Sequence, residues 1–542
     1  MPGQEPRLHP AALSVRESER MGIPSWLRRL GALPLYPLLA AAYPVIWLYA
    51  QNVQEAIAPS EILVPLATSV AATVGVLLLL GALTRRWAPA ALTSTVLLVL
   101  FWTYGMAWDW LGKSLPGEWV LLGAWLGLAV AGIYLIWRFN ARAGLLTVPL
   151  NAALGLALAF NLAIIGAFAL NIRPTAAHTD SGVTASGEPA TVERRPDIYW
   201  IITEEYGSQS VLDTDFHYDN SPFLAALRDR GFYIANHSTA NYLKTAPSID
   251  SARNLQYLDG AALRAQAKSD SDWGPMYHGL QSPFEVQEFL GNLGYRFIYA
   301  GTFWSPMGKH PSAEINYVYD KLTPEFLGVL QRATMLRALD DLIPDAPYDW
   351  RLNRYNQTLY ELRSLRHAST LGGPKFIQTQ LALNHEPYVF HPDGSFITAD
   401  EARSLTHTQQ YIEQLKYTNT QLLAWVDQLL DVPEDQRPII VMLADEGPWP
   451  NGYREDERDF DWTTASAEDL KQKFGILNAV YLPGKSAEGV GFYDSVSEVN
   501  EFRVIFNAYF GLDLPLLPDR NYIWPNQSDI YDFVDVTDKV EH

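Results

Sequence analysis

Three short stretches of the sequence place side chains that can bind metals or move protons directly after an apolar run. Glu204 and Glu205 follow PDIYWIIT, Asp445 and Glu446 follow PIIVMLA, and His385 stands in LALNHEPYVF. Carboxylate oxygens are the ligands that Mg²⁺, Mn²⁺ and Ca²⁺ prefer, and a histidine also admits Zn²⁺. If the apolar runs are neighbouring strands, these five side chains converge at one sheet edge. The sequence then predicts a divalent-metal site there.

Each acidic pair also has a simpler interpretation when it is taken alone. Acidic residues often stand at the start of a helix that follows a strand, where they interact with the free amide groups and the helix dipole. Spacing alone favours this capping role for both pairs. It is the combination of the two pairs with His385 that favours a metal site.

A hydroxyl group in the stretch ANYLKTAPSIDSARNLQYL adds a candidate nucleophile. Thr245 and Ser248 lie near the predicted start of a helix. A hydroxyl in that position can bind a metal as an alkoxide and attack phosphorus or sulfur, while the helix amides hold the anionic group. From the residues alone, an ordinary helix-capping threonine is the better explanation of the position.

The elements that must position these residues alternate between strand and helix. Short β-branched and aromatic runs predict strands, and longer amphipathic patterns between them predict helices. The order predicts an α/β domain around a mostly parallel sheet, with ligands bound beyond the carboxyl ends of the strands. The predicted strands are 198–203, 232–235, 296–300, 376–383, 439–443 and 477–481, and the clearest helices are 221–230, 283–293 and 407–430.

The first third of the chain has a different composition, because residues 30–170 are nearly free of charge and rich in Leu, Ala, Val and Trp. Segments of about 20 such residues are long enough to cross a bilayer. Buried helices of a soluble protein rarely run so long without charge, so we expect an α-helical transmembrane bundle with about five spans. The predicted spans are 30–50, 62–83, 90–110, 119–137 and 145–170.

Basic residues predict the topology, since they are retained on the cytoplasmic side of membrane helices. Arg28 and Arg29 precede the first span, and further arginines follow the second and fourth spans. We therefore expect a multi-pass cell-membrane protein with four parts: a cytoplasmic N-terminus (1–29), a transmembrane domain (30–170), a Pro-, Ser- and Thr-rich linker (171–195) and an extracytoplasmic domain (196–542).

Charge and cysteine content restrict the partners. The formal net charge is -20, and the acidic excess lies in residues 196–542. Nucleic acid is excluded as a partner because its binding depends on basic surface. The chain has no cysteine, which suits an extracytoplasmic domain that needs no disulfide chemistry. The sequence gives no indication of oligomeric state.

Several motifs of residues 196–536 resemble the membrane-anchored branch of the sulfatase and alkaline-phosphatase superfamily. That branch includes lipoteichoic acid synthases and phosphoethanolamine transferases. Five spans before the catalytic domain are also typical of the lipoteichoic acid synthase branch. The motifs occur in the family's order, and they are IITEEYG, DNSPFLAALRDRGFYIANHSTANYLKTAPSIDS, GYRFIYAGTFWSP, QYIEQLKYTNTQLL, ADEGPWP, KFGILNAVYLPG and EFRVIFNAYFGLDLPLLPDRNY.

The resemblance implies a role for each site residue. Glu204 and Asp445 correspond to metal ligands, Thr245 to the nucleophile and a further ligand, and His385 to a residue that binds phosphoryl or sulfuryl oxygens. Glu205 is an additional candidate ligand. This chain departs from the common Asp-His-Gly motif at Glu446, where a carboxylate replaces the imidazole and favours a harder ion than Zn²⁺.

The function implied is metal-dependent transfer or hydrolysis of a phosphoryl group, of the phosphoglycerol or phosphoethanolamine type, on a phospholipid or another lipid-linked substrate. Mn²⁺ or Mg²⁺ is the favoured cofactor, with Zn²⁺ or Ca²⁺ as alternatives. A plain phosphodiesterase or sulfatase would use the same residues, although the lack of cysteine excludes a formylglycine sulfatase of the cysteine type. Glu446 leaves a further alternative, a catalytically degenerate protein that binds or assembles components of the cell envelope.

Overall fold

The computed structural model describes residues 33–53, 62–111, 118–171, 195–319, 325–339, 350–457 and 459–540. The predicted cytoplasmic N-terminus and nearly all of the predicted linker lie outside these ranges. The chain divides into two compact units. The first consists of Met1–Val53, Ile57–Ile172 and Phe326–Ala346, and the second of Gln54–Ala56, Arg173–Glu325 and Pro347–His542.

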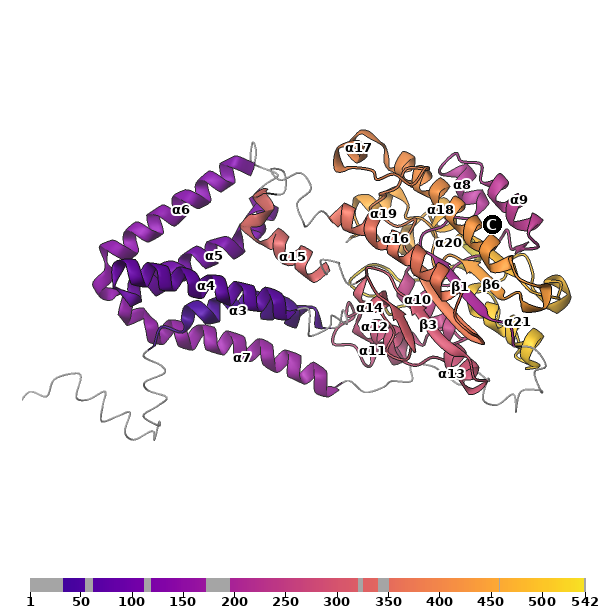
Figure 1. Ribbon diagram of the computed structural model, residues 1–542, viewed down its shortest axis with the longest axis horizontal. Helices are drawn as coiled ribbons and strands as arrows, with labels where there is room; N and C mark the ends of the chain where they lie inside the picture. Colours follow the sequence, from indigo (N-terminus) through magenta and orange to yellow (C-terminus); the bar gives the residue numbers. More distant parts are fainter. Residues whose placement is uncertain are drawn as a thin grey trace, which may run out of the picture. The chain divides into compact units, whose positions relative to one another are not determined.

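The first unit is a bundle of apolar helices (Figure 1). Four segments are long and apolar enough to cross a membrane by length and composition, namely Leu63–Thr84, Trp87–Leu111, Trp119–Arg138 and Asn140–Ala167. The segment predicted as the first span forms a shorter helix of 16 residues that begins just before Pro37. The helices are α3 (Tyr36–Gln51), α4 (Leu63–Thr84), α5 (Trp87–Leu111), α6 (Glu118–Arg138) and α7 (Thr147–Asn171), with the 3-10 helix η4 (Asn140–Leu146) before α7.

A short segment from the later part of the sequence also belongs to the first unit. It contains α15 (Glu325–Ala333) and the 3-10 helix η5 (Met335–Leu339). Phe326 and Leu330 of α15 are buried in a cluster with Val45 and Tyr49 of α3. No span or helix was predicted there, because the segment is too short and too polar to be read as a membrane helix.

The second unit is built on a seven-stranded sheet with the order β2-β7-β6-β1-β5-β3-β4. Strands β1, β3, β4, β5 and β6 pair with one another in parallel. Strand β7 is antiparallel to both of its neighbours, β6 and β2. All six predicted strands are confirmed, and β4 and the β8-β9 pair are additional. The strands are β1 (Ile198–Thr203), β2 (Tyr233–Ile234), β3 (Arg296–Ala300), β4 (Ile315–Tyr317), β5 (Lys375–Leu381), β6 (Ile439–Leu443), β7 (Asn478–Tyr481), β8 (Tyr522–Ile523) and β9 (Val534–Asp535).

The three central strands, β1, β5 and β6, are buried at every position. This is the pattern expected of parallel strands that are covered on both faces by helices, as Figure 1 shows for this unit. The α-helices of the unit are α8 (Gln209–Thr214), α9 (Ser221–Asp229), α10 (Thr245–Arg253), α11 (Gly260–Arg264), α12 (Gly274–Gln281), α13 (Glu285–Asn292), α14 (Ser305–Gly308), α16 (Trp350–Ala368), α17 (Ala399–Ser404), α18 (His407–Leu430), α19 (Asn451–Glu455), α20 (Ala467–Phe474), α21 (Glu498–Phe510) and α22 (Thr537–Val540).

The predicted fold class, a membrane-type helical bundle followed by an α/β domain with a mostly parallel sheet, is confirmed. The register of the central strands then fixes where the candidate residues lie. Ile202 of β1 pairs with Leu443 of β6, so Glu204 and Asp445 each stand two residues beyond this pair. Because parallel strands end at the same sheet edge, the two carboxylates are brought side by side.

Candidate active site

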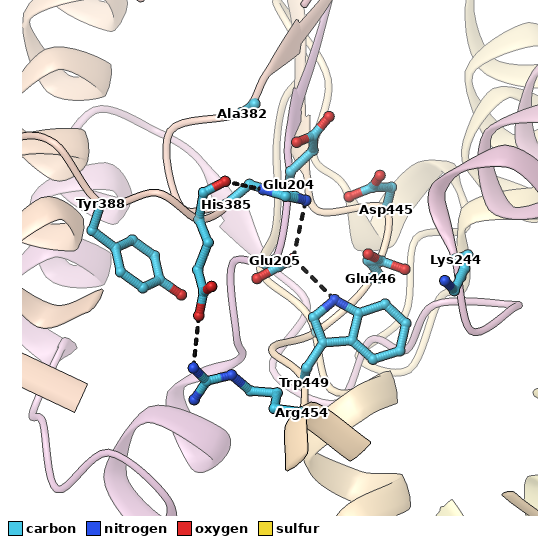
Figure 2. A network of polar contacts seen from close by, with 12 residues as sticks. Glu204, Glu205, Lys244, Ala382, His385, Tyr388, Asp445, Glu446, Trp449 and Arg454 are labelled. Atoms are coloured by element: carbon cyan, nitrogen blue, oxygen red, sulfur yellow. Dashed lines mark hydrogen bonds and ion pairs between the residues drawn. The ribbon is translucent and has the colours of Figure 1, made fainter. Parts of the chain in front are cut away.

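The two acidic strand ends meet at a shared glutamine. Gln380 of β5 donates from Nε2 to Glu204 Oε1 at 2.8 Å and to Asp445 Oδ2 at 3.2 Å. Glu204 is 4% exposed and Asp445 is fully buried. Figure 2 shows their carboxylates facing one another beyond the ends of β1 and β6. The sheet therefore holds two carboxylates and an amide in one small polar space.

Thr245 lies at the first position of α10, and its side chain borders the same space. Burial raises the pKa of Asp445, and the nearby Thr245 hydroxyl offsets part of this shift, although Asp445 Oδ1 has no hydrogen-bond partner of standard geometry. The opening residues of α10 line a cavity of about 490 Å³ that also contacts Glu204, Glu205, His385 and Glu446. Asp445 is buried and does not itself line the cavity. The structure thus brings together all six residues predicted from the sequence.

Glu205 continues from Glu204 through a sharp change of backbone direction. Its φ is +53°, in the left-handed region that non-glycine residues rarely occupy. The Tyr411 hydroxyl donates to the Glu205 carbonyl at 2.8 Å, and the indole N–H of Trp449 donates to Glu205 Oε1 at 3.0 Å. This turn lets two consecutive glutamates line one cavity.

His385 lies on the opposite side of Glu205 from Trp449 (Figure 2). Its Nδ1 contacts the Glu386 carbonyl oxygen at 2.6 Å, and its Nε2 is 3.7 Å from Glu205 Oε1. Burial lowers the pKa of His385, but the negative charges of Glu205 and Glu204 outweigh this and raise the pKa above its ordinary value. The raised pKa makes the protonated form of His385 easier to reach, and that form suits contact with an anion.

Glu446 differs from the other carboxylates in its partner, which is a buried lysine. Lys473 Nζ lies 3.2 Å from Glu446 Oε2, and the Lys473 side chain is fully buried. The same ammonium group donates to the Gly447 carbonyl at 2.9 Å and lies 3.1 Å from the centre of a Trp449 ring.

Burial raises the pKa of three of these carboxyl groups. For Asp445 the negative charges of Glu446 and Glu204 add to the effect, and for Glu446 and Glu205 the positive charge of Lys473 opposes it. Crowded, buried carboxylates of this kind need either protons or a cation to be stable.

The residues fit a divalent cation of the oxygen-preferring type. As the side chains stand, no group of three or more His, Cys, Asp or Glu residues able to hold a metal ion is found in the ranges that the structure describes. Two carboxylates and a hydroxyl do converge, however, in Glu204, Asp445 and Thr245. Two buried carboxylate oxygens of this site, Asp445 Oδ1 and Glu446 Oε2, accept no hydrogen bond, and the second lies 3.2 Å from Lys473 Nζ. Asp445 Oδ1 is therefore the atom available as a ligand, and an all-oxygen set suits Mg²⁺ or Mn²⁺.

The outer wall of the cavity is aromatic and contains fixed charges. Lys244 lies 5.3 Å from the ring centre of Trp449, and its Nζ is 3.2 Å from Glu457 Oε1. Near the cavity's other side, Glu386 accepts from Arg454 at 2.7 Å and is 2.9 Å from His407. The remaining aromatic lining residues are Trp273, Tyr277, Phe303, Trp304, Tyr388 and Tyr453.

Several polar residues of this region were not predicted from the sequence, and three of them lie closest to the candidate site residues. Gln380 had a signal, because the run FIQTQL puts polar residues inside a fully buried strand, where they need polar partners. Lys244 stands directly before Thr245 and could have been found by that position. Lys473 had no signal, since a lysine near the end of the amphipathic helix α20 is normally a solvated residue.

Comparison with known proteins gives structural likenesses only. No family model matches the sequence, and no curated protein matches it. The C-terminal periplasmic domain of EcEptC from Escherichia coli, solved in complex with Zn, is 11% identical and has a TM-score of 0.39, covering 66% of this chain and 96% of that one.

Two further solved structures are similar in the same degree. The lipoteichoic acid synthase LtaP from Listeria monocytogenes is 15% identical with a TM-score of 0.38, covering 65% of this chain and 90% of that one. A protein in the alkaline phosphatase superfamily from Vibrio parahaemolyticus is 15% identical with a TM-score of 0.39, covering 62% and 75%.

Proposed function

We propose that this chain is a membrane-bound transferase or hydrolase of phosphoryl groups that uses Thr245 as its nucleophile. The observation that supports this most directly is the position of Thr245. Its hydroxyl lies at the start of a nine-residue helix, faces the buried carboxylate of Asp445 and borders an open cavity. Helix amides can hold an anionic group there while the hydroxyl attacks it.

The reaction is a double displacement in this proposal. Thr245 Oγ1 forms a bond to phosphorus, and the bond from phosphorus to the lipid oxygen breaks. The hydroxyl proton of Thr245 is passed on to the departing lipid alcohol, which balances the charge. Water or an acceptor hydroxyl then attacks the phosphothreonine, and its proton returns to the Thr245 oxygen. His385, whose pKa is raised by the negative charges of Glu205 and Glu204, binds the phosphoryl oxygens.

A divalent cation would be held by Glu204, Asp445 and Thr245, with Mn²⁺ or Mg²⁺ favoured and Zn²⁺ or Ca²⁺ as alternatives. When bound, it would lower the pKa of the hydroxyl and neutralise charge on the phosphoryl group. Gln380 keeps the two carboxylates together by donating to both. Its role is positioning rather than chemistry.

The substrate in this proposal is a phospholipid or another lipid-linked phosphodiester outside the cytoplasm. A site on a chain with four membrane-length apolar helices meets lipid head groups at high effective concentration. The aromatic cavity wall offers surface for the carbon atoms of a head group, and Lys244 offers a positive charge for its phosphate.

Replacement of the nucleophile tests the proposal. We expect Thr245→Ala in the full-length chain, reconstituted in vesicles of phosphatidylglycerol or phosphatidylethanolamine with Mn²⁺, to lower turnover by about a thousandfold, because the covalent step is lost. Mass spectrometry of the unaltered chain should detect a phosphate-containing adduct on the peptide that contains Thr245, and the variant should lack it.

Ser248→Ala is the matched control on the same helix. The Ser248 hydroxyl is buried and donates to the Tyr242 carbonyl at 3.3 Å, so it has no access to substrate. Its removal should leave the adduct in place. An adduct or turnover that persists in Thr245→Ala would remove Thr245 from the proposed role.

A further inference from the structure

Lys473 is a buried cation within the acidic cluster. Its side chain is fully buried at the carboxyl-terminal end of α20, and it does not line the cavity. Its ammonium group contacts one carboxylate, one carbonyl and one aromatic face, which are provided by Glu446, Gly447 and Trp449. A buried ammonium is retained only where such partners replace its hydration.

The backbone of Lys473 is fixed by contacts with Gly447, as its side chain is. The Gly447 N–H donates to the Lys473 carbonyl at 2.8 Å, so the two residues bond in both directions. A Cβ atom added at Gly447 would lie 2.3 Å from the Gln472 carbonyl oxygen and 2.8 Å from that of Lys473. Only glycine allows the loop after β6 to approach α20 this closely. The local fold therefore places the ammonium group beside Glu446 in one geometry.

The carboxylates of the site fall into two groups by the charges they contact. Glu446 forms an ion pair with Lys473, and Trp449 connects this pair to Glu205 by contacting the ammonium with its ring and donating its N–H to the carboxylate. Glu204 and Asp445 share the neutral amide of Gln380, and the buried cation that acts on Glu204 is the Arg354 guanidinium, which forms no direct ion pair with it. Within the described ranges, neither of these two carboxylates forms an ion pair with a Lys, Arg or His.

We infer that Lys473 is a built-in cation that neutralises Glu446, so that Glu446 is not a metal ligand and the site holds one divalent cation, on Glu204, Asp445 and Thr245. This inference rests on the metal dependence in the proposed function and narrows its ligand set. It also accounts for the departure from Asp-His-Gly at Glu446, since the Glu446–Lys473 pair is neutral overall, as an unprotonated imidazole would be. In this chain a neutral ion pair, Glu446 with Lys473, stands where the common motif has a neutral imidazole.

The inference predicts which variants keep the ion. The full-length chain in detergent, dialysed against Mn²⁺ and measured by elemental analysis, should hold one Mn²⁺ per chain. Asp445→Asn should weaken Mn²⁺ binding at least a hundredfold in titration calorimetry, because it removes a ligand charge. The double variant Glu446→Gln with Lys473→Met removes both charges of the pair and should bind Mn²⁺ within about threefold of the unaltered chain.

Thermal unfolding of each variant separates loss of a ligand from loss of the fold. Lys473→Met alone leaves Glu446 buried without its cation and should lower the melting temperature more than the double variant does. If the folded double variant loses Mn²⁺ as fully as Asp445→Asn, or if a second ion of the unaltered chain disappears with Glu446→Gln, the inference is overturned while metal dependence stands. If the unaltered chain binds no Mn²⁺, the proposed metal-dependent function fails, and the inference fails with it.

Discussion

Lys244 stands directly before the candidate nucleophile, and its ammonium group is held at the cavity wall. Its Nζ lies 5.6 Å from the ring centre of Trp273, 5.3 Å from that of Trp449 and 5.8 Å from that of Tyr453. Glu457 contacts it at 3.2 Å. Three aromatic faces and one carboxylate orient the charge without burying it, which leaves it available to an anionic substrate.

We expect Lys244→Gln to weaken substrate binding more than it slows chemistry. A charge-assisted hydrogen bond to phosphate contributes about 1.5–3 kcal/mol, so KM should rise by about tenfold or more while kcat changes by less than that. Steady-state kinetics on phospholipid vesicles provides both values.

Lys416→Gln is the control for loss of a lysine charge. Lys416 is exposed on α18 and also lies over an aromatic ring, that of Tyr218 at 5.6 Å, but it does not line the cavity. Equal KM values for the Lys244 variant and the unaltered chain would contradict a role in binding the anion.

At this scale the sequence predicted which acidic residues lie together, but it did not predict the residues that contact them. Glu204 and Asp445 could be paired in advance, because acidic residues at the ends of two adjacent parallel strands must meet at one sheet edge. Lys473 could not, since it reaches Glu446 through a contact between α20 and the loop after β6 that no local pattern encodes. The expectation that Glu446 is a metal ligand came from its position in a motif, and a motif does not include the lysine that contacts it.

Among the elements, the membrane-type helices and the central strands follow from composition and periodicity, whereas α15 does not. Residues 325–339 form α15 and η5. They pack with the helices of the first unit, although in the sequence they lie between strands β4 and β5 of the second unit. Arg337 forms an ion pair with Asp109 of α5 at 2.7 Å. An amphipathic segment of this length is recognisable only once the surface it covers is known.

The packing of this segment depends on Gly105 of α5. A Cβ atom added there would lie 2.0 Å from the Arg332 carbonyl oxygen and 2.6 Å from Ala333 Cα. Gly105→Leu should therefore displace the segment, because overpacking of this kind typically costs about 1–3 kcal/mol. We expect trypsin to cleave after Arg337 at least several times faster in the variant, measured by mass spectrometry on the full-length chain in detergent.

Gly123→Leu is the matched substitution, since Gly123 lies on α6 with no atom within 4 Å of an added Cβ. It places the same side chain in the same helical unit and should leave the rate of cleavage after Arg337 unchanged. If both leucine variants and the unaltered chain are cleaved at the same rate, the segment is not held at Gly105.

For the whole molecule, the decisive property is that two parts of one chain require different surroundings. The first unit exposes leucines and valines along α4, α6 and α7, as a lipid-facing bundle must. The second unit has a fully buried central sheet and an acidic composition typical of a water-soluble domain. The proposal that the second unit is extracytoplasmic rests on the arginines that follow the second and fourth spans.

The absence of native cysteine makes this topology directly testable, because a single introduced thiol is the only one in the chain. Ser486 is exposed in the second unit, and Ala141 is exposed between Arg138 and Arg142, where the positive-inside rule predicts the cytoplasm. In cells from which all layers outside the cell membrane have been removed, a membrane-impermeant maleimide should label Ser486→Cys directly. It should label Ala141→Cys only after the membrane is permeabilised. Labelling in the opposite order would place the site in the cytoplasm, where it could not act on lipids of the outer leaflet.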